Sequence, residues 1–562
     1  MSAPFNETHD VVVVGSGAGG MAAALTAAHA GLDVVVIEKA ATVGGSTAVS
    51  GGAVWIPMNP HLDAVGATDS REAVYAYLGA ILGNRLRRDM IDAFLDAGPE
   101  MVAFLEANSA VRFTPRAVSP DYQPALPGAS LSGRTIDPSP FDGRELGEHF
   151  ALLRPPFDEF MAFGGLMVGR KDIDALMGVV SSPDNFLAAM KLLSRYALDR
   201  LRYPRGTRLL MGNALAARLL KSALDRKIPL RTRTAAQSLI RENGRVVGLV
   251  AERDGETLRI AARRGVVLAT GGFAHDAARV AAMLPHPTQH YTMSPKDDRG
   301  DGLRMALEAG AEVADDNIGN AFWAPVSVMQ DKGREIRFPH LIMDRQKPGL
   351  VAVNQAGERF VNEARSYHEF VEAMHHSHET TPTIPAYLIC DHRFLRKYGL
   401  GLVRPALRPL GRFLRSGYLV RAATIPELAS RLGMDAGRLT KTIARMNEYA
   451  LTGVDAEFGK GGDAYNQYLG DPKHKPNPCL GPIERAPFYA VRVYPGDIGT
   501  AAGLKTDARA RVLGAGGEPI GGLYACGNDM NSVMAGAYPG AGITLGPALT
   551  FGYIVGRELA RG

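Results

Sequence analysis

The chain has few cysteines and no long apolar run. Its 562 residues include three cysteines, Cys390, Cys479 and Cys526, which are far apart and form no CxxC pair. This spacing argues against a disulfide framework or a structural zinc site and favours a reducing compartment. No uninterrupted apolar run reaches the ~18 residues that a membrane-spanning helix needs. The first residues also lack the basic and apolar regions of a signal peptide, so we expect a cytoplasmic protein.

A strong excess of one charge is also missing. The 63 Lys and Arg residues nearly balance the 58 Asp and Glu residues, and the net charge of +5 gives no electrostatic footprint for nucleic acid. His375, His376 and His378 lie close together in the sequence, but no carboxylate or second ligand cluster accompanies them, so we expect no metal site. With 46% hydrophobic residues, a chain of this length is globular and forms two or three domains.

A glycine-rich turn follows an apolar stretch near the N-terminus. Residues 11–20 read VVVVGSGAGG, which predicts a buried strand, a tight turn and the start of a helix. Gly15 permits the turn, Gly17 lets a pyrophosphate approach the main chain, and Gly20 lets the helix pack on the strand. The helix N-terminus offers free N–H groups to phosphate. Glu38, at the end of the next strand, is placed to accept ribose hydroxyl groups, so we predict a dinucleotide site.

Three later segments have the composition of further cofactor contacts. A loop with two glycine pairs covers residues 43–57, a strand over 265–269 ends in Thr270-Gly-Gly272, and a late strand ends in Cys526-Gly-Asn528. Asn243-Gly244 predicts a type I′ hairpin turn between two further strands. No second strand–GxGxxG–helix unit is present for a nicotinamide cofactor. The predicted cofactor contacts are Gly15, Ser16, Gly17, Ala18, Gly19, Gly20, Glu38, Lys39, Gly45, Ser46, Thr47, Gly51, Gly52, Ala236, Thr270, Gly271, Asn528, Asp529, Ile543, Thr544 and Leu545.

Together these segments resemble the two-domain flavoproteins of the fumarate reductase and succinate dehydrogenase superfamily. The resemblance implies FAD as the cofactor and an α/β fold, in which a Rossmann-like FAD-binding domain carries an inserted α+β catalytic domain that caps the substrate. We expect residues 1–315 and 485–562 to form the FAD-binding domain and residues 316–484 the catalytic domain. Residues 146–208 form an extra apolar and basic segment, a departure from shorter family members. If FAD is the only redox cofactor, electrons leave to a quinone or another small acceptor.

Three tyrosines stand in short motifs that resemble those of the 3-ketosteroid Δ1-dehydrogenases. The motifs are Pro120-Asp-Tyr122, Gly357-Glu-Arg-Phe-Val-Asn-Glu363 followed by Tyr367, and Tyr538-Pro-Gly-Ala-Gly542. The likeness covers most of the chain except about residues 146–208. It implies an FAD-dependent dehydrogenation of a steroid or sterol ketone between C1 and C2.

The resemblance assigns a role to each member of this set. The Tyr538 hydroxyl and the Gly542 N–H would bind the C3 carbonyl oxygen, stabilise enolate character and acidify the C2 hydrogen. Tyr367 would take the C2 proton as a phenolate, and Tyr122 would hydrogen-bond to it and share its charge. Because an unperturbed tyrosine has a pKa of about 10, Tyr367 needs a lowered pKa or a proton relay. The flavin N5 would accept hydride from C1.

Other functions fit parts of the same pattern. The dicarboxylate enzymes of the superfamily bind a charged substrate with arginine and histidine near the flavin, whereas residues 530–552 contain no Arg, Lys or His. A 3-keto-5α-steroid Δ4-dehydrogenase is a closer alternative with the same fold and cofactor, although the three tyrosines favour Δ1. The non-enzymatic alternative is a flavin-loaded sterol binder at a membrane surface.

Two segments combine apolar and basic residues. Residues 146–208 predict a helix over 186–198 with arginines beside it, and residues 392–426 contain eight cations and no acid, with leucines interleaved. Pro405 and Pro409 break any single long amphipathic helix, so a solvated loop is the plain alternative to contact with anionic lipid. We predict a peripheral contact on the cytoplasmic side of a membrane, and acceptance of ketosteroids that retain a sterol side chain.

Overall fold

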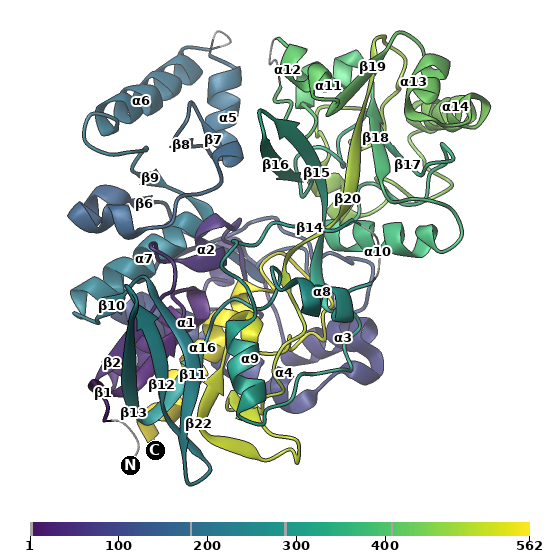
Figure 1. Ribbon diagram of the computed structural model, residues 1–562. Helices are drawn as coiled ribbons and strands as arrows, with labels where there is room; N and C mark the ends of the chain where they lie inside the picture. The colour runs from purple at the N-terminus through teal and green to yellow at the C-terminus, as the bar shows by residue number, and fades with distance from the viewer. Residues whose placement is uncertain (1–3, 180–181, 286–288, 406–408, 562) are drawn as a thin grey trace.

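The computed structural model describes residues 4–179, 182–285, 289–405 and 409–561. Two large sheets with separate sets of helices organise this part of the chain (Figure 1). Both chain termini lie in the unit at the lower left of Figure 1, and the strand β20 runs from the upper unit down towards it. The expected α/β architecture is therefore confirmed.

The first sheet has eight strands, in the order β10-β2-β1-β13-β12-β11, with β22 beside β13 and β21 beside β22. The strand β1 lies between β2 and β13 and runs parallel to both, while β11, β12 and β13 form an antiparallel meander. The strand bounds are β1 Glu7–Val14, β2 Val34–Ile37, β10 Leu230–Arg231, β11 Thr234–Glu242, β12 Arg245–Arg253, β13 Glu256–Leu268, β21 Arg511–Leu513 and β22 Pro519–Ala525. The apolar run in β1 becomes the buried centre of this sheet.

Helix α1 (Ala18–His29) follows β1 and packs against the C-terminal helix α16 (Leu545–Arg561). The two helices approach closely because glycines meet at the contact. A Cβ added to Gly552 would lie 2.3 Å from the carbonyl oxygen of Gly19, and one added to Gly556 would lie 2.5 Å from Cβ of Thr26. This packing places the start of α16 close to the cofactor sheet.

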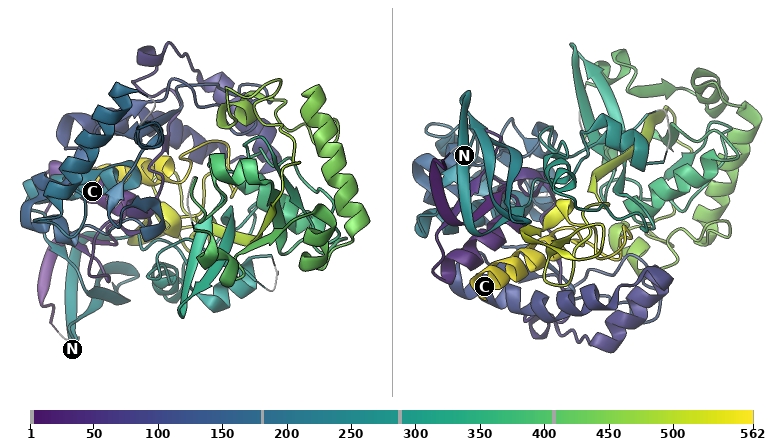
Figure 2. Two further views of the ribbon diagram at one scale, coloured as in Figure 1. Left: turned by 90° about the horizontal axis from the view of Figure 1, so that it is seen from above. Right: turned by 60° about the horizontal axis from the view of Figure 1, so that its bottom comes forward.

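The second sheet has seven strands, in the order β16-β15-β20-β18-β17, with β14 and β19 also paired to β20. The bounds are β14 Tyr291–Thr292, β15 Ala321–Asp331, β16 Arg334–Pro339, β17 Leu350–Val353, β18 Ala386–Cys390, β19 Leu419–Ala422 and β20 Phe488–Thr500. The division at residues 316–484 stays a sequence-based proposal, and this sheet extends beyond it on both sides, through β14 and β20. Figure 2 shows the yellow tail lying between this unit and the helices of residues 71–108.

Several local predictions agree with the structure. Apolar residues recur at helical spacing over residues 69–108, which predicts packing helices, and the structure has two helices there, α3 (Arg71–Leu82) and α4 (Arg88–Asn108). Asn243 and Gly244 have φ values of 49° and 80°, as a type I′ turn requires. The remaining elements are β3 Val54–Trp55, β4 Phe113–Pro115, β5 Thr135–Pro138, α2 Gly45–Val49, α7 Met211–Asp225, α8 Ala277–Met283, α9 Asp301–Glu308, α10 Tyr367–His378, α11 His392–Tyr398, α12 Gly411–Arg415, α13 Ile425–Leu432, α14 Ala436–Thr452, α15 Ala464–Leu469 and the 3-10 turns η1 Asp63–Val65, η2 Gly83–Arg85 and η5 Gly527–Asp529.

The extra segment around residues 146–208 forms a lobe at the upper left of Figure 1. Its elements are β6 Phe141–Asp142, η3 Gly143–Leu152, η4 Asp158–Phe160, β7 Met161–Ala162, β8 Leu166–Met167, α5 Arg170–Met177, α6 Pro183–Asp199 and β9 Arg208–Leu209. The predicted helix over 186–198 is therefore present as α6. The lobe touches the second unit through Arg404, which donates to the carbonyl oxygens of Glu159 (3.0 Å) and Met161 (2.9 Å).

Candidate active site

The glycine turn after β1 has the shape that the sequence predicts. Gly15 has a φ of +106°, and a Cβ there would lie 2.1 Å from the carbonyl oxygen of Ala269, so only glycine fits. A Cβ at Gly17 would meet only Oγ1 of Thr47, at 3.8 Å, which leaves the space above this residue open. Gly17 is the N-cap of α1 and brings no capping side chain, while Oγ1 of Thr47 accepts from the N–H of Ala18. The N–H groups that follow in the first turn fit a pyrophosphate group.

Glu38 stands directly after β2 and is held by hydrogen bonds. Its Oε2 accepts from the main-chain N–H (3.1 Å) and the hydroxyl (2.6 Å) of Ser16, and its Oε1 accepts from the N–H of Ala40 (2.9 Å). Oε2 thus uses both of its lone pairs, whereas Oε1 keeps a second lone pair for a ribose hydroxyl. The carboxylate is therefore fixed beside the glycine turn, where the sequence places a ribose contact.

The other predicted cofactor contacts separate into two groups. Thr47 lies at the turn, because its Oγ1 accepts from the N–H of Ala18 at 2.9 Å. Buried Asp529 accepts from the N–H of Thr270 at 2.6 Å and thus joins the two strand ends. Three other predicted contacts have protein partners instead, because Ser46 donates to Asp298, Lys39 pairs with Asp301, and Gly52 packs against Met211 and Gly212. Ala236 is buried in β11.

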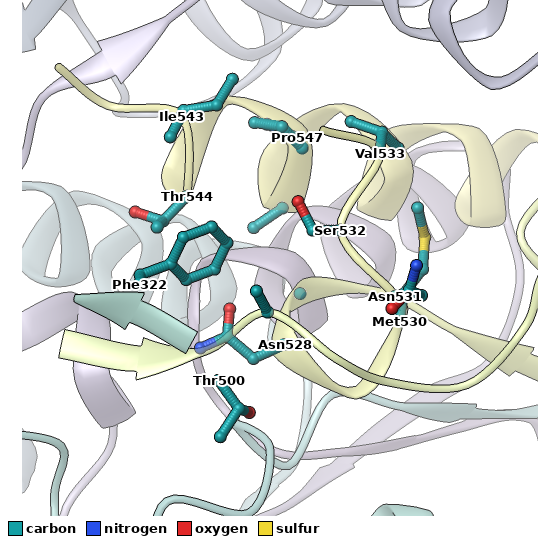
Figure 3. A pocket seen from close by; sticks show the side chains of 13 residues that line it. Phe322, Thr500, Asn528, Met530, Asn531, Ser532, Val533, Ile543, Thr544 and Pro547 are labelled. Atoms are coloured by element: carbon teal, nitrogen blue, oxygen red, sulfur yellow. The ribbon is translucent and has the colours of Figure 1, made fainter. Parts of the chain in front are cut away.

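A small pocket lies between the second sheet and the tail (Figure 3). The lining residues are Phe322, Thr500, Ala501, Gly527, Asn528, Met530, Asn531, Ser532, Val533, Ile543, Thr544, Pro547 and Ala548. Of these, the sequence predicts Asn528, Ile543 and Thr544 as cofactor contacts. Pro547 lies in the first turn of α16, so the positive end of this helix faces the pocket. This suits the edge of a flavin ring on which negative charge collects.

The three predicted tyrosines, far apart in the sequence, come together beside this pocket. The Tyr122 hydroxyl donates to the Tyr367 hydroxyl at 3.0 Å. The Tyr122 and Tyr538 rings stack with centroids 5.3 Å apart, and Tyr367 meets Tyr538 edge-on at 5.3 Å. Phe322, which lines the pocket, lies edge-on to Tyr538 at 5.7 Å. The tyrosine cluster therefore adjoins the pocket at the start of α16.

Burial controls the acidity of these phenols. All three tyrosines are 6% exposed. Desolvation raises the pKa of Tyr538 to about 12 and raises the pKa values of Tyr122 and Tyr367 well above their ordinary range. The phenols are thus protonated and able to donate, and a base among them needs further stabilisation of its charged form.

The main chain of Tyr538–Gly542 is held through its carbonyl oxygens. The carbonyl oxygen of Pro539 accepts from the Tyr77 hydroxyl (2.6 Å) and from the N–H of Tyr122 (2.9 Å), and that of Gly542 accepts from the N–H of Trp55 (3.1 Å). Gly542 has a φ of +102°. None of the residues that the structure describes accepts a hydrogen bond from the Gly542 N–H, which leaves it available to an incoming oxygen.

A buried ion cluster holds the segment that leads into Tyr122. Arg134, 1% exposed, donates to Asp121 and Asp69 at 2.7 Å each. The indole N–H of Trp55 donates to the other oxygen of Asp121 at 2.9 Å. Asp121 directly precedes Tyr122, so the cluster fixes the segment that carries this tyrosine.

Sequence reasoning missed several neighbours of the cluster. Tyr465 in α15 packs on Tyr122 with ring centroids 4.8 Å apart, and no hydrogen bond is recorded for its buried hydroxyl in the described residues. His368 lies 5.6 Å from Tyr538 by ring centroids and accepts from the N–H of Trp323 at 3.1 Å. No local motif marks Tyr465. His368 directly follows Tyr367, so the motif that marks Tyr367 could also have pointed to His368.

Comparisons with known proteins agree with this geometry. A family model described as an FAD binding domain matches residues 10–545. A curated 3-oxosteroid 1-dehydrogenase from Mycolicibacterium smegmatis is 39% identical, over 99% of this chain and 97% of the relative. The chain belongs to the 3-ketosteroid Δ1-dehydrogenase family of FAD-dependent oxidoreductases. FAD as cofactor is therefore confirmed.

Two further proteins show a comparable similarity. The crystal structure of 3-ketosteroid Δ1-dehydrogenase from Sterolibacterium denitrificans, in complex with 1,4-androstadiene-3,17-dione, has a TM-score of 0.92 at 40% identity. The match covers 99% of this chain and 100% of that one. A curated 4-oxocyclohex-2-ene-1-carboxylate 5-dehydrogenase from Sinomonas cyclohexanicum is 40% identical, over 98% of this chain and 94% of the relative. Sequence identity alone thus does not separate a steroid from a small ring ketone.

Proposed function

We propose that the chain catalyses the FAD-dependent 1,2-dehydrogenation of 3-ketosteroids. The observation that carries the proposal is the meeting of Tyr122, Tyr367 and Tyr538 beside the pocket at the start of α16. Relatives at 39–40% identity with this activity in their names support it. The residue roles below are part of the proposal.

Tyr538 and Gly542 form the oxyanion hole in this proposal. The phenol of Tyr538 and the free N–H of Gly542 bind the C3 carbonyl oxygen, on which negative charge develops when C2 loses its proton. The raised pKa of Tyr538 keeps its proton in place, so the hydroxyl remains a donor. Both donors are fixed by surrounding packing before the substrate arrives, so little reorganisation is needed.

Tyr367 removes the C2 proton, and Tyr122 stabilises the charge that results. The 3.0 Å contact between their hydroxyl groups lets Tyr122 donate to the Tyr367 oxygen as it becomes negative. FAD, when bound, supplies a hydride acceptor at N5 for the hydrogen that leaves C1. The chain itself supplies the acid, the base and the enclosure that excludes water.

The observation that favours a steroid over a ring ketone with a carboxylate is the engagement of the nearby cations. A bound carboxylate needs a cationic partner to offset desolvation. Arg116 is held in a bidentate pair with Asp137 at 2.7 Å, and Arg345 donates to main-chain carbonyl oxygens. Within the described residues, both cations close to the tyrosine cluster are thus already bonded to the protein.

The direct test is anaerobic mixing of the FAD-loaded protein with candidate substrates. Androst-4-ene-3,17-dione and cholest-4-en-3-one are expected to bleach the flavin and to give 1,4-dienes that are lighter by two hydrogens. Bleaching by 4-oxocyclohexanecarboxylate alone, or by a dicarboxylate alone, would contradict the steroid assignment. A 5α-saturated ketone converted only to the 4-ene would identify a Δ4-dehydrogenase, and a failure of every compound to bleach the flavin would favour a binding protein.

A peripheral membrane contact through residues 146–208 and 392–426 is the second part of the proposal. On α6 the side chains of Phe186, Leu187 and Leu198 are 51%, 64% and 67% exposed, so this helix presents apolar surface. In the second segment Arg404 bonds to the lobe, while Leu407 and Arg408 lie outside the described residues. No helix in the described ranges is long and apolar enough to cross a bilayer.

Liposome sedimentation tests this contact. The protein is expected to bind vesicles that contain anionic lipid, less so as salt increases, and to bind neutral vesicles weakly. Leu187→Glu with Leu198→Glu should abolish binding, whereas Leu451→Glu, at an 82% exposed position on α14, should not. Equal binding by the double variant and the control would contradict the assignment to α6.

The electron acceptor is the third part of the proposal. A quinone or another small oxidant must reach the reduced cofactor, because the chain carries no second dinucleotide motif for a nicotinamide cofactor. We expect the bleached flavin to be reoxidised by a soluble quinone analogue faster than by dissolved oxygen. Reoxidation by oxygen alone would contradict a quinone acceptor.

A further inference from the structure

Arg345 is a buried cation that has no carboxylate within ion-pair distance in the described part of the chain. Its side chain is 0% exposed. The guanidinium donates instead to main-chain carbonyl oxygens, with Nε to His340 at 2.7 Å and one terminal nitrogen to Leu341 at 3.0 Å. Burying a charge in this way is costly, so a cation held only by dipoles needs an explanation.

The other terminal nitrogen of Arg345 grips the segment that leads into Tyr367. It donates to the carbonyl oxygens of Glu363 at 2.8 Å and Arg365 at 3.2 Å. The guanidinium also lies 4.8 Å from the ring centroid of Phe370, one turn further along α10. Tyr367 is the first residue of this helix, so Arg345 holds the chain on both sides of it.

The charge of Arg345 also acts on the phenols. Burial raises the pKa of Tyr465 and of Tyr122, and the guanidinium interacts electrostatically with both. An opposite charge favours the ionised form of a buried group. Tyr122 in turn bonds to the Tyr367 hydroxyl. A positive charge therefore lies close enough to Tyr122 to interact with it electrostatically.

We propose that Arg345 is a positioning residue for proton abstraction: it fixes the main chain that carries Tyr367, and its positive charge stabilises the phenolate that Tyr367 and Tyr122 share. This inference rests on the proposed function. It explains why the charge has no carboxylate partner, since a close ion pair would cancel most of its field at the tyrosines.

The neighbouring acid Asp344 is occupied by other donors. It accepts from the His340 ring at 2.6 Å, from the main-chain N–H of Arg345 at 2.9 Å and from that of Gly401 at 3.2 Å. The other His340 nitrogen lies 2.7 Å from the Ser327 hydroxyl, which lies 2.7 Å from Tyr418. Although burial opposes it, the neighbouring His340 ring holds the pKa of Asp344 below its ordinary value, so this carboxyl is anionic.

Other charged groups around the tyrosine cluster are held in ion pairs within the protein. Glu363 is paired with Arg359 and Lys460, and Arg116 with Asp137. The titratable and charged groups that face the tyrosines or Arg345 are Tyr77, Arg116, Asp121, Asp137, Asp344, Glu363, His368, Glu369, Asp463 and Tyr468. Arg345 differs from Arg116 because its charge has no bidentate carboxylate.

The test compares Arg345→Lys, which keeps the charge, with Arg345→Gln, which keeps polar donors but not the charge. Flavin bleaching by androst-4-ene-3,17-dione is followed against pH by stopped flow. For Arg345→Gln we expect the ascending limb of the rate to move to higher pH by at least one unit, and the deuterium isotope effect at C2 to increase. For Arg345→Lys the limb should stay in place while the maximal rate falls.

The matched control is the double variant Arg116→Met with Asp137→Asn, which removes a cation and its partner together. The ascending limb of its pH–rate profile should stay at the wild-type pH, because the net charge beside the tyrosines is unchanged. If the ascending limb of the pH–rate profile lies at the same pH for the Lys and Gln variants, the proposed role of the charge is overturned. If the wild type is not bleached by any ketosteroid, the proposed function fails instead, so the two failures are distinguishable.

A second variant covers the case in which Arg345→Gln does not retain FAD. Asp344→Asn removes the anion next to Arg345 and leaves the guanidinium in place. The ascending limb should then move to lower pH, since the positive charge acts with less compensation. An unchanged limb, or one that moves upward, would overturn the proposal.

Discussion

Tyr538→Phe isolates the oxyanion contribution of a single hydroxyl. The side chain is 6% exposed, and its ring packs on Tyr122, Tyr367 and Phe322 at centroid distances of 5.3, 5.3 and 5.7 Å. Phenylalanine keeps these contacts. The substitution therefore removes a hydrogen-bond donor without opening a cavity, and the fold and the FAD site should stay intact.

The expected loss of rate depends on whether the Tyr538 hydroxyl stabilises the ground state or the transition state. A neutral hydrogen bond to a ground-state carbonyl contributes about 0.5–1.5 kcal/mol net. An oxyanion-hole donor contributes about 2.7–4 kcal/mol to the transition state, which corresponds to about 10²–10³ in rate. Gly542 N–H remains as the second donor. We expect kcat to fall about 10²–10³-fold while the affinity for the ketosteroid changes by much less.

Stopped-flow bleaching of the flavin under anaerobic conditions measures this step directly. Tyr553→Phe is a suitable control, because Tyr553 is a buried tyrosine of the same tail whose ring contacts Phe104 rather than the cluster. The control should bleach at the wild-type rate. A Tyr538→Phe variant with bound FAD and wild-type turnover would refute the oxyanion assignment.

Three further outcomes are expected. Tyr122→Phe should lower the bleaching rate at least tenfold at neutral pH, because Tyr367 loses its 3.0 Å donor, and a wild-type rate would contradict a shared charge. Arg134→Met should lower the free energy of unfolding by about 3–5 kcal/mol in a urea titration, since it leaves buried Asp121 without its cation; a loss below 1 kcal/mol would contradict this. The guanidinium and ammonium groups beside buried Glu363 hold the pKa of that carboxyl below its ordinary value. The carboxylate of Glu363 therefore contributes its full stabilisation above the unfolded pKa of about 4.3. This stabilisation is lost as the pH falls through the lower pKa of the folded state. Acid unfolding monitored by circular dichroism measures the loss.

The sequence was sufficient where one segment dictates its own geometry. Gly15 and Gly20 predict a turn that no other residue fits, and Asn243-Gly244 predicts a hairpin through its positive φ values. Glu38 also lies beside the glycine turn, because it directly follows the strand next to β1. In each case the pattern and the contact that it makes are close together in the chain or on adjacent strands.

Sequence reasoning failed where a contact depends on how the two units dock. Tyr465 and Arg345 carry no motif, and their positions become meaningful only when α15 and the segment before α10 meet at Tyr122. Phe322 belongs to the catalytic sheet and Asn531 to the tail, yet both line the same pocket. No local periodicity encodes such a meeting.

The site therefore depends on three separated parts of the chain, and each contributes what the others lack. Tyr122 and its buried ion cluster come before the lobe, Tyr367 opens a helix of the catalytic unit, and Tyr538 lies in the tail. The tail loop is held in part by Tyr77, more than 450 positions earlier, whose hydroxyl donates to the carbonyl oxygen of Pro539. In the proposed mechanism, a cofactor bound at the glycine turn is thus not enough for activity. The proposed oxyanion donors and base come together only when both units pack around the tail, so catalysis would depend on the complete fold rather than on the first sheet alone.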